Sequence, residues 1–413
     1  MFKDERIRSI RAFIISPSAD EGDPPLEDDP EAAGMTEEVF NWRRQKVANP
    51  MTKYPEFRDS RSASMGKYLS ALIVVVAESE GGHIGIGTTS GGIAAAAIVE
   101  FQLARMVEGD SVFAHERHWD RMYNSTVAQG RKGTALHAIS AVDIALWDLH
   151  GKVTQTPVYA LLGGPVSASV DVYGTGPSPS KIHDLGFWGA KLPLTWGPSE
   201  GVDGFRRNVE RAAAAREATS ADFPLLYDCW MALDVDYAIR LSWALDDLGF
   251  RWIEEPLMPD DYAGHAELRR RMPPRMQLTA GEHEYTARGH DLLAKSGVDI
   301  LQPDPAWCGG ITEMRRIAAV ASINGKRLIP HVGGQYSYHF LAAQPDAFMA
   351  EFPVMQGLGD RIVPQHESLF TGEALPVDGK ITVGDAPGFG LELKESVKLH
   401  RPFPPEWESL PRG

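Results

Sequence analysis

Eight short apolar runs alternate with segments of about helix length from about residue 169 onward. In chain order the runs are VDVYG, FWGAKL, PLLYD, RWIE, QLTAGE, DILQPD, RLIPH and AFMAEF. Six of the seven intervals hold plausible helices; the pattern is weakest in the first interval, and no clear helix follows the eighth run. A βαβ unit takes about 30 residues, and successive units of this kind close into a parallel barrel. The sequence therefore predicts an α/β fold built on a modified TIM barrel of the (β/α)7β type.

Polar residues stand at the ends of these runs, in the same order as the strands. They are Lys191, Asp228, Glu254, Glu282, Asp304, His331 and Glu351. In a parallel barrel the carboxyl ends of all strands meet at one face, where active sites are found. Exposure to solvent does not explain why polar residues end these buried strands in order. Half-buried charges must be paired or must bind a metal. The pattern predicts a functional site at the mouth of the barrel.

Three of these residues are predicted metal ligands: Asp228, Glu254 and Glu282. Their spacings are 254 − 228 = 26 and 282 − 254 = 28 residues, about one βαβ step each. Three carboxylates without a cysteine or histidine at ligand spacing indicate a hard cation, Mg²⁺ first and Mn²⁺ as a possible substitute. The structural alternative is a salt-bridge network, for which Arg251 and Lys191 are the local basic partners.

A histidine and an aspartate at neighbouring strand ends form a predicted catalytic pair. An Asp304 carboxylate beside the His331 imidazole would fix its tautomer and raise its basicity, as a general base requires. His283 follows a predicted metal ligand and faces either the barrel wall or the substrate. His339 lies in a probable helix after the site, where packing or surface exposure is expected.

The chain before the barrel has an α+β pattern. Residues 1 to about 65 are predicted to be irregular, with an acidic, proline-rich loop at EGDPPLEDDPEA. YLSALIVVVAESE and GGHIGIGTTSGG then indicate two strands, and helical patterns follow at 91–108, 115–128 and GTALHAISAVDIALWDLHGKV. We predict a capping domain over 1–155, a barrel over 156–369, and a segment 370–413 that returns to the capping domain.

Composition limits the partners and the compartment. A net charge of −15 argues against nucleic acid, whose phosphate backbone needs a basic patch. The longest apolar segment, ALIVVVA at 71–77, is far shorter than the ~20 residues of a membrane-spanning helix, and the charged N-terminus shows no secretory signal or transit peptide. Only Cys229 and Cys308 occur, which is typical of a reducing compartment, here the cytoplasm. Both cysteines are better explained as small buried fillers than as catalytic thiols.

Motifs along most of the chain resemble one family. They are PMTKY, AVDIALWDLHGKV, PVYALLGG, KLPLTWGP, DCWMALDVDYA, RWIEEP, GEH, LQPDPAWCGG, IPH and PGFGLEL. Together they resemble the mandelate racemase subgroup of the enolase superfamily, and within it the L-rhamnonate dehydratases. The resemblance implies a Mg²⁺-dependent hydro-lyase that converts a small-molecule sugar acid into a 2-keto-3-deoxy sugar acid. It also implies a homo-oligomer.

The resemblance implies roles for the strand-end residues by position. Asp228, Glu254 and Glu282 would hold the metal, and His331 with Asp304 would be the catalytic dyad.

Further roles follow from the same resemblance. Lys191 would add positive charge at the reacting centre, and Glu351 would hydrogen-bond a substrate carboxylate oxygen. Arg61, His283 and Trp307 are predicted as further substrate contacts.

Two departures from the family pattern bear on the reaction and the substrate. Many relatives carry Lys-x-Lys at the second strand, whereas this chain reads Lys191-Leu192-Pro193, which removes the second base that a racemase needs. Residues 1–82 hold no histidine, and Asn41-Trp42 stands where the family has His-Trp. We therefore expect the substrate to be L-rhamnonate or a similar aldonate that differs from it. A racemase or epimerase of a carboxylate, or a catalytically silent sugar-acid binder, remains the alternative.

Overall fold

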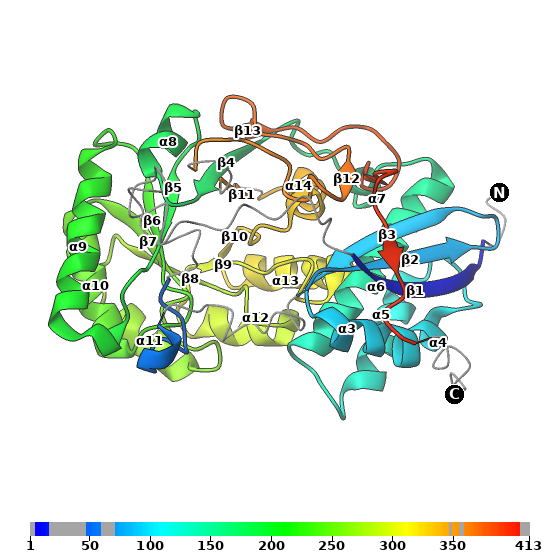
Figure 1. The fold of residues 1–413 in the computed structure, drawn as a ribbon, viewed down its shortest axis with the longest axis horizontal. Helices are drawn as coiled ribbons and strands as arrows, with labels where there is room; N and C mark the ends of the chain where they lie inside the picture. The colour runs from blue at the N-terminus through cyan, green and yellow to red at the C-terminus, as the bar shows by residue number, and fades with distance from the viewer. Residues whose placement is uncertain (1–4, 16–46, 59–70, 347–348, 355–358, 405–413) are drawn as a thin grey trace.

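A barrel and a smaller cap lie side by side in this protein (Figure 1), for which the computed structural model describes residues 5–15, 47–58, 71–346, 349–354 and 359–404. In Figure 1 the barrel with α9, α10 and α11 lies to the left, and the cap with β1, β2 and β3 lies to the right. Within these ranges the helices are too short or too polar to span a lipid bilayer.

The barrel is a parallel sheet whose eight strands follow one another in chain order. They are β4 (Val170–Thr175), β5 (Ala190–Pro193), β6 (Leu225–Asp228), β7 (Phe250–Glu254), β8 (Gln277–Ala280), β9 (Ile300–Leu301), β10 (Arg327–Leu328) and β11 (Ala350–Pro353). The last strand pairs with the first, with Ala350 opposite Val172. Among the described residues β10 and β11 do not pair, so the sheet is open at that seam. The predicted barrel is confirmed, and each of the eight predicted runs overlaps a strand.

Seven helices cover the outside of the barrel. They are α8 (Pro179–Asp184), α9 (Gly201–Glu217), α10 (Val235–Asp247), α11 (Tyr262–Arg271), α12 (Thr286–Lys295), α13 (Gly310–Ile323) and α14 (Gly334–Ala342). In α9, Asn208, Ala212 and Ala215 are buried against the sheet, while Arg206 and Glu210 are exposed. This is the apolar stripe of an amphipathic helix. The helix α8 has six residues, in the interval where the sequence pattern was weakest.

The cap contains an antiparallel sheet ordered β15, β1, β2, β3. Its strands are β1 (Ile7–Ile15), β2 (Ile73–Ser79), β3 (Ile84–Thr89) and β15 (Leu399–His400). The prediction that residues 1 to about 65 are irregular is wrong for β1. Arginines interrupt its apolar residues, and the pairing register with β2 shifts between Ile7 and Ser9, so the two-residue period is hidden in the sequence. The acidic stretch at 21–32 lies outside the described residues.

Four helical segments of the cap pack on its sheet: α3 (Gly92–Ile98), the π-helical turn η2 (Val99–Leu103), α4 (Ala104–Val107) and α6 (Thr134–Thr154). The helices α5 (His115–Thr126) and α7 (Val158–Leu161) contact α6 instead. The α6 backbone approaches β3 so closely that a Cβ on Gly85 or Gly87 would lie 2.1 Å from a carbonyl oxygen of α6. Glycine is therefore required at both positions, because any side chain would push the helix off the sheet.

Segments far apart in sequence join the cap to the barrel. β13 (Lys380–Ile381) pairs with β4, and β15 pairs with β1, so the C-terminal segment touches both parts. β12 (Phe370–Thr371) pairs with β14 (Glu392–Leu393) in the same segment. The domain bounds predicted from the sequence stay a prediction.

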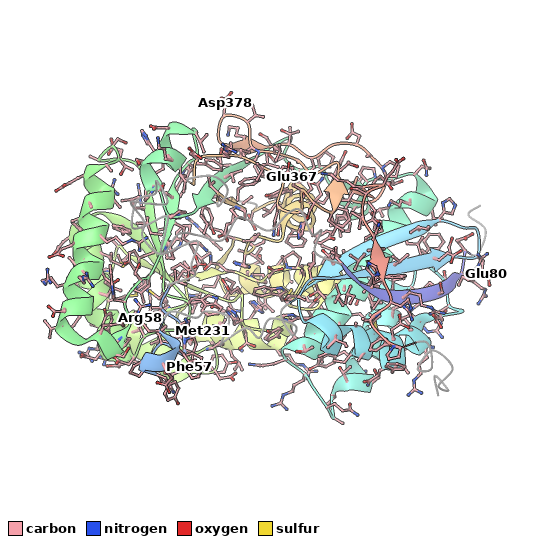
Figure 2. All side chains as sticks on the ribbon, viewed as in Figure 1. Phe57, Arg58, Glu80, Met231, Glu367 and Asp378 are labelled. Atoms are coloured by element: carbon pink, nitrogen blue, oxygen red, sulfur yellow. The ribbon has the colours of Figure 1, made fainter. Side chains whose placement is uncertain are left out.

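The described part of the N-terminal segment, 47–58, docks on the barrel. The Ala48 amide donates to the Leu194 carbonyl at 2.9 Å, and Arg58 pairs with Glu200 next to the short helices η1 (Pro55–Phe57) and η3 (Pro198–Glu200). Figure 2 places Phe57 and Arg58 at the barrel end of the molecule, opposite Glu80 at the far end of the cap. Residues 47–58 therefore lie on the rim of the barrel, whereas β1 belongs to the cap.

Replacing Asp148 by alanine should destabilise the fold by roughly 2 to 4 kcal/mol, because two buried amides would lose their acceptor. Its carboxylate accepts from the Ile86 and Phe389 amides, each at 2.9 Å, and so ties α6 to β3 and to the C-terminal segment. Urea unfolding followed by tryptophan fluorescence measures the change. The control is Glu210→Ala, which removes an exposed ion pair with Arg206 and should cost less than about 0.5 kcal/mol. Equal costs for the two variants would contradict the assignment.

Candidate active site

The strand-end residues gather at the carboxyl ends of the barrel strands. Lys191 lies in β5, Asp228 and Glu254 end β6 and β7, and Glu351 lies in β11. The parallel register sets Asp228 directly opposite Glu254. The other three stand just beyond their strands: Glu282 after β8, Asp304 after β9 and His331 after β10. The shared face that the sequence predicted therefore brings all seven to one end of the barrel.

Strained backbone marks the same end of the barrel. Five of the seven non-glycine residues with positive φ in the described ranges follow a barrel strand that carries a site residue. They are Trp230, Met231, Glu255, Thr286 and Val332. Residues held in left-handed conformations cost about 1 to 3 kcal/mol each and cluster at functional sites. This observation points to the same face without reference to the side chains.

Lys191 is a cation among the predicted metal ligands. Its Nζ lies 3.7 Å from Asp228 Oδ2 and 2.9 Å from Glu351 Oε1, and it also contacts Glu254. The alternative salt-bridge network thus has one of its two proposed basic partners in place. The other, Arg251, is exposed.

One ammonium group does not balance the buried negative charge around it. Burial raises the pKa of Glu254 and Lys191 lowers it, but Asp228, Glu351 and Glu282 add to the rise, so the pKa reaches about 8. A further positive charge nearby would stabilise the ionised form of such crowded carboxylates. Asp228, Glu254 and Glu282 offer only oxygen atoms, which are the donors that Mg²⁺ and Mn²⁺ prefer. The residues present fit such an ion.

A second set of possible ligands lies closer together. Among the described residues, Glu255, Glu282 and His283 have potential ligand atoms within 4.8 Å of one another, whereas Asp228 and Glu254 belong to no set that tight. Glu255, however, accepts from His283 Nδ1 at 2.6 Å and from the His283 amide at 3.1 Å. Burial would raise its pKa, but the His283 imidazole lowers it to about 2. Glu255 is therefore the ionised partner of His283, which leaves the strand-end trio as the more suitable ligand set.

The predicted dyad is assembled. His331 Nδ1 lies 2.9 Å from Asp304 Oδ2, and the opposite ring nitrogen, Nε2, lies 3.3 Å from Glu282 Oε2. The Asp304 carboxylate accepts a hydrogen bond from the Nδ1–H group, which leaves Nε2 directed at the site. Burial lowers the pKa of His331, but the carboxylates of Glu282 and Asp304 outweigh this effect and raise the pKa to about 10. A cation held by Glu282 would bring that pKa down.

A cavity of about 400 Å³ adjoins the dyad. Its lining combines cap residues, barrel residues and the segment after β11: Leu72, Thr88, Thr89, Ser90, Asp304, Ala306, Trp307, His331, Val332, Gly333, Tyr336, Pro353, Val363, Pro364, Gln365 and His366. Another cavity, of about 330 Å³, lies between α13 and α14 and touches none of the predicted site residues. The first cavity is therefore the candidate substrate pocket.

The Trp307 indole makes aromatic contacts with three histidine rings. Its ring centroid is 5.2 Å from that of His331, 5.6 Å from that of His283 and 5.5 Å from that of His137, with His137 nearly parallel to it. His137 belongs to α6, so a cap residue supports the indole that packs against the dyad. No sequence pattern indicates a role for His137, because its partner Trp307 is 170 residues away.

Glu351 is fully engaged by donors of the protein. It accepts from Lys191, from the Tyr173 hydroxyl at 3.1 Å, from the Val332 amide at 3.2 Å and from Thr175. Burial would raise its pKa, but Lys191 and His331 lower it to about 2. Glu351 is thus an ionised acceptor in this structure. Its predicted contact with a substrate carboxylate stays a prediction.

The contacts predicted for the N-terminal segment are not among the described residues. Arg61 and the Asn41-Trp42 pair lie outside the described residues, and so does most of the histidine-free loop.

Family models, a curated protein and solved structures all identify relatives of this chain. The N-terminal domain of the mandelate racemase/muconate lactonizing enzyme family matches residues 53–163, and the enolase C-terminal domain-like family matches residues 181–397. An L-rhamnonate dehydratase of Saccharopolyspora erythraea is 45% identical over 399 residues, covering 96% of this chain and 99% of that protein. The structure of a rhamnonate dehydratase from Gibberella zeae complexed with Mg has a TM-score of 0.86 at 36% identity, with 95% of each chain covered. A racemase of Streptomyces coelicolor with bound magnesium has a TM-score of 0.72 at 27% identity, covering 94% of this chain and 97% of that one.

Magnesium should raise the thermal unfolding midpoint of the wild type, because an ion that binds only the folded state stabilises it. Asp228→Asn should lose this gain. Without magnesium the variant should be at least as stable as the wild type, since one crowded negative charge is gone. Differential scanning calorimetry with EDTA and with MgCl₂ measures both quantities. Asp236→Asn, an exposed acid on α10, should keep the full gain; an equal gain in Asp228→Asn would exclude Asp228 as a ligand.

Proposed function

Because this chain belongs to the mandelate racemase/muconate lactonizing enzyme family, we propose that it is a magnesium-dependent sugar acid dehydratase, a hydro-lyase. One observation carries the proposal: a histidine–aspartate dyad and three carboxylates share one end of the barrel beside a cavity. We propose Asp228, Glu254 and Glu282 as the metal ligands and His331 with Asp304 as the dyad. L-Rhamnonate or a similar aldonate is the substrate, in keeping with the rhamnonate dehydratases among the relatives.

Proton abstraction is the first step. The C–H bond next to a carboxylate is far less acidic than imidazolium, whose reference pKa is about 6.5, so a base alone does not suffice. A bound divalent cation supplies Lewis-acid stabilisation of the charge that develops on the substrate carboxylate. His331 takes the proton at Nε2, and Asp304 stabilises the imidazolium that results.

Loss of the neighbouring hydroxyl completes the dehydration. The C–O bond at the β-carbon breaks, and the protonated His331 returns its proton to the departing hydroxyl, which leaves as water. The enol then tautomerises to the 2-keto-3-deoxy acid. The balance is one water lost per substrate, with no oxidant or reductant.

Lys191 acts through its charge. Burial lowers its pKa, but Glu254 and Glu351 outweigh burial and hold the pKa above the usual value. A lysine that stays protonated adds positive charge and does not serve as a base. Pro193, at the other inward position of β5, has no titratable group. Both facts favour one-base dehydration over racemisation, although a racemase is among the structural relatives.

The aromatic and histidine side chains of the pocket are proposed substrate contacts. Trp307 lines the cavity, and His283 points toward its indole and toward Glu282. Arg61 is proposed from the family position alone. The absence of histidine from residues 1–82 allows a hydroxyl configuration other than that of rhamnonate.

Compartment and assembly complete the proposal. Cys229 and Cys308 are buried and free, which supports a reducing compartment, the cytoplasm. A homo-oligomer is proposed from the family resemblance.

The purified enzyme should form an α-keto acid from L-rhamnonate in the presence of Mg²⁺, and EDTA should abolish this reaction. A semicarbazide assay over a panel of five- and six-carbon aldonates detects the product and finds the preferred configuration. His331→Asn should lower kcat by at least about 100-fold, because the base is gone. Stereochemical inversion without loss of water would establish a racemase instead, and tight binding without turnover would establish a sensor.

Asp304→Asn should leave the imidazole in place yet lower kcat by about 100-fold or more, because a neutral partner no longer stabilises the imidazolium. The KM should change much less, since Asp304 does not need to touch the substrate. Steady-state kinetics of folded protein separate the two parameters. A variant with wild-type kcat would remove Asp304 from the mechanism.

A further inference from the structure

A lysine of the cap reaches across to the barrel beside the candidate site. Lys132 lies between α5 and α6, and its Nζ is 2.8 Å from Glu284 Oε1, 2.6 Å from Asp260 Oδ1 and 3.3 Å from the Tyr262 hydroxyl. All three partners belong to the barrel, on the loops that follow β7 and β8 or on α11. The contact therefore fixes the distance between the cap and two barrel loops.

Glu284 is the buried member of this group. Its side chain is 0% exposed, whereas that of Asp260 is 78% exposed. A buried carboxylate needs a partner, and removing its cation is far more costly than removing one member of an exposed pair. The Glu284 carboxylate also accepts from the Tyr285 amide at 2.7 Å. Lys132 is thus the cation that allows Glu284 to stay buried.

Packing leaves Glu284 little freedom to move. A Cβ placed on Gly289 of α12 would lie 2.2 Å from Glu284 Oε1, so the side chain fills the space against that helix. Glu284 is two residues from Glu282 and next to His283. The buried Glu284 side chain therefore anchors the loop that carries both site residues.

We propose that Lys132 is a positioning residue: through Glu284 it holds the loop Gly281–Tyr285 so that Glu282 and His283 face the site. The metal-binding part of this proposal rests on the proposed function, whereas the ordering of the loop does not. Outer contacts of this type commonly change metal affinity by about 10- to 100-fold when they are removed. The cap would then contribute to the metal site without supplying a ligand.

The test compares variants of the full-length protein. Lys132→Met removes the charge and keeps the length of the side chain, and Lys132→Arg restores the charge. Arg131→Met is the matched control, because Arg131 is the exposed neighbour of Lys132. Asp260→Asn removes only the exposed partner.

Two measurements are made on each variant. Hydrogen–deuterium exchange without metal follows the peptide that contains residues 281–285, and electron paramagnetic resonance titration gives the affinity for Mn²⁺. In Lys132→Met we expect faster exchange centred on this peptide and at least about ten-fold weaker Mn²⁺ binding. Lys132→Arg should recover much of both, and Arg131→Met and Asp260→Asn should resemble the wild type.

Three outcomes would contradict either the positioning role of Lys132 or the proposed function. Unchanged exchange at 281–285 in Lys132→Met would overturn the positioning role. Exchange that rises equally across the whole chain would also overturn it, because that result describes a general loss of stability. A wild type that binds no Mn²⁺ would overturn the proposed function, while the exchange data would still decide whether Lys132 orders the loop.

Discussion

Mutual repulsion among buried carboxylates is the constraint on which this site depends. Asp228, Glu351 and Glu282 each raise the energy of charging the buried Glu254, and Asp228 also raises that of Glu282. Lys191 offsets part of this cost, and its ammonium group is held between Glu254 and Glu351. In the proposed function, a divalent ion held by Asp228, Glu254 and Glu282 would offset the remainder. The repulsion among the acids would then favour binding of the ion, and the ion would lower the basicity of His331.

The proposed catalytic residues lie on the barrel, and the cap forms one wall of the cavity beside them. Thr88, Thr89 and Ser90 of the cap line the cavity, but their hydroxyls bind protein groups: the Tyr336 hydroxyl at 2.9 Å, the Ala306 carbonyl at 2.7 Å and His137 Nδ1 at 3.1 Å. These bonds fix the cap wall against the ends of the barrel strands. The aromatic stack of His137 on Trp307 works in the same direction. Residues of both parts of the chain therefore line the cavity, whereas the proposed catalytic residues all belong to the barrel.

The structural features that could be predicted from the sequence are those that are local and periodic. Each barrel strand was found because a short apolar run between helical segments is a local pattern, and the strand ends followed because parallel strands share one face. Contacts that depend on distant segments had no such signal. Glu255 could be noticed only as a second acid after Glu254, and nothing near Lys132 in the sequence indicates Glu284. The strand β1 was missed because its arginines and its shifted register hide the two-residue period. The role of Arg61 rests on family position alone.

A crystal of the protein soaked in Mn²⁺, measured with anomalous scattering, tests the central claim most directly. The account predicts one strong peak bound by oxygens of Asp228, Glu254 and Glu282 at about 2.1 to 2.2 Å, close to the distances of magnesium. It also predicts that the Lys191 ammonium keeps its contact with Glu351. A peak held by Glu255 and His283, or no peak among the strand-end acids, would contradict the account.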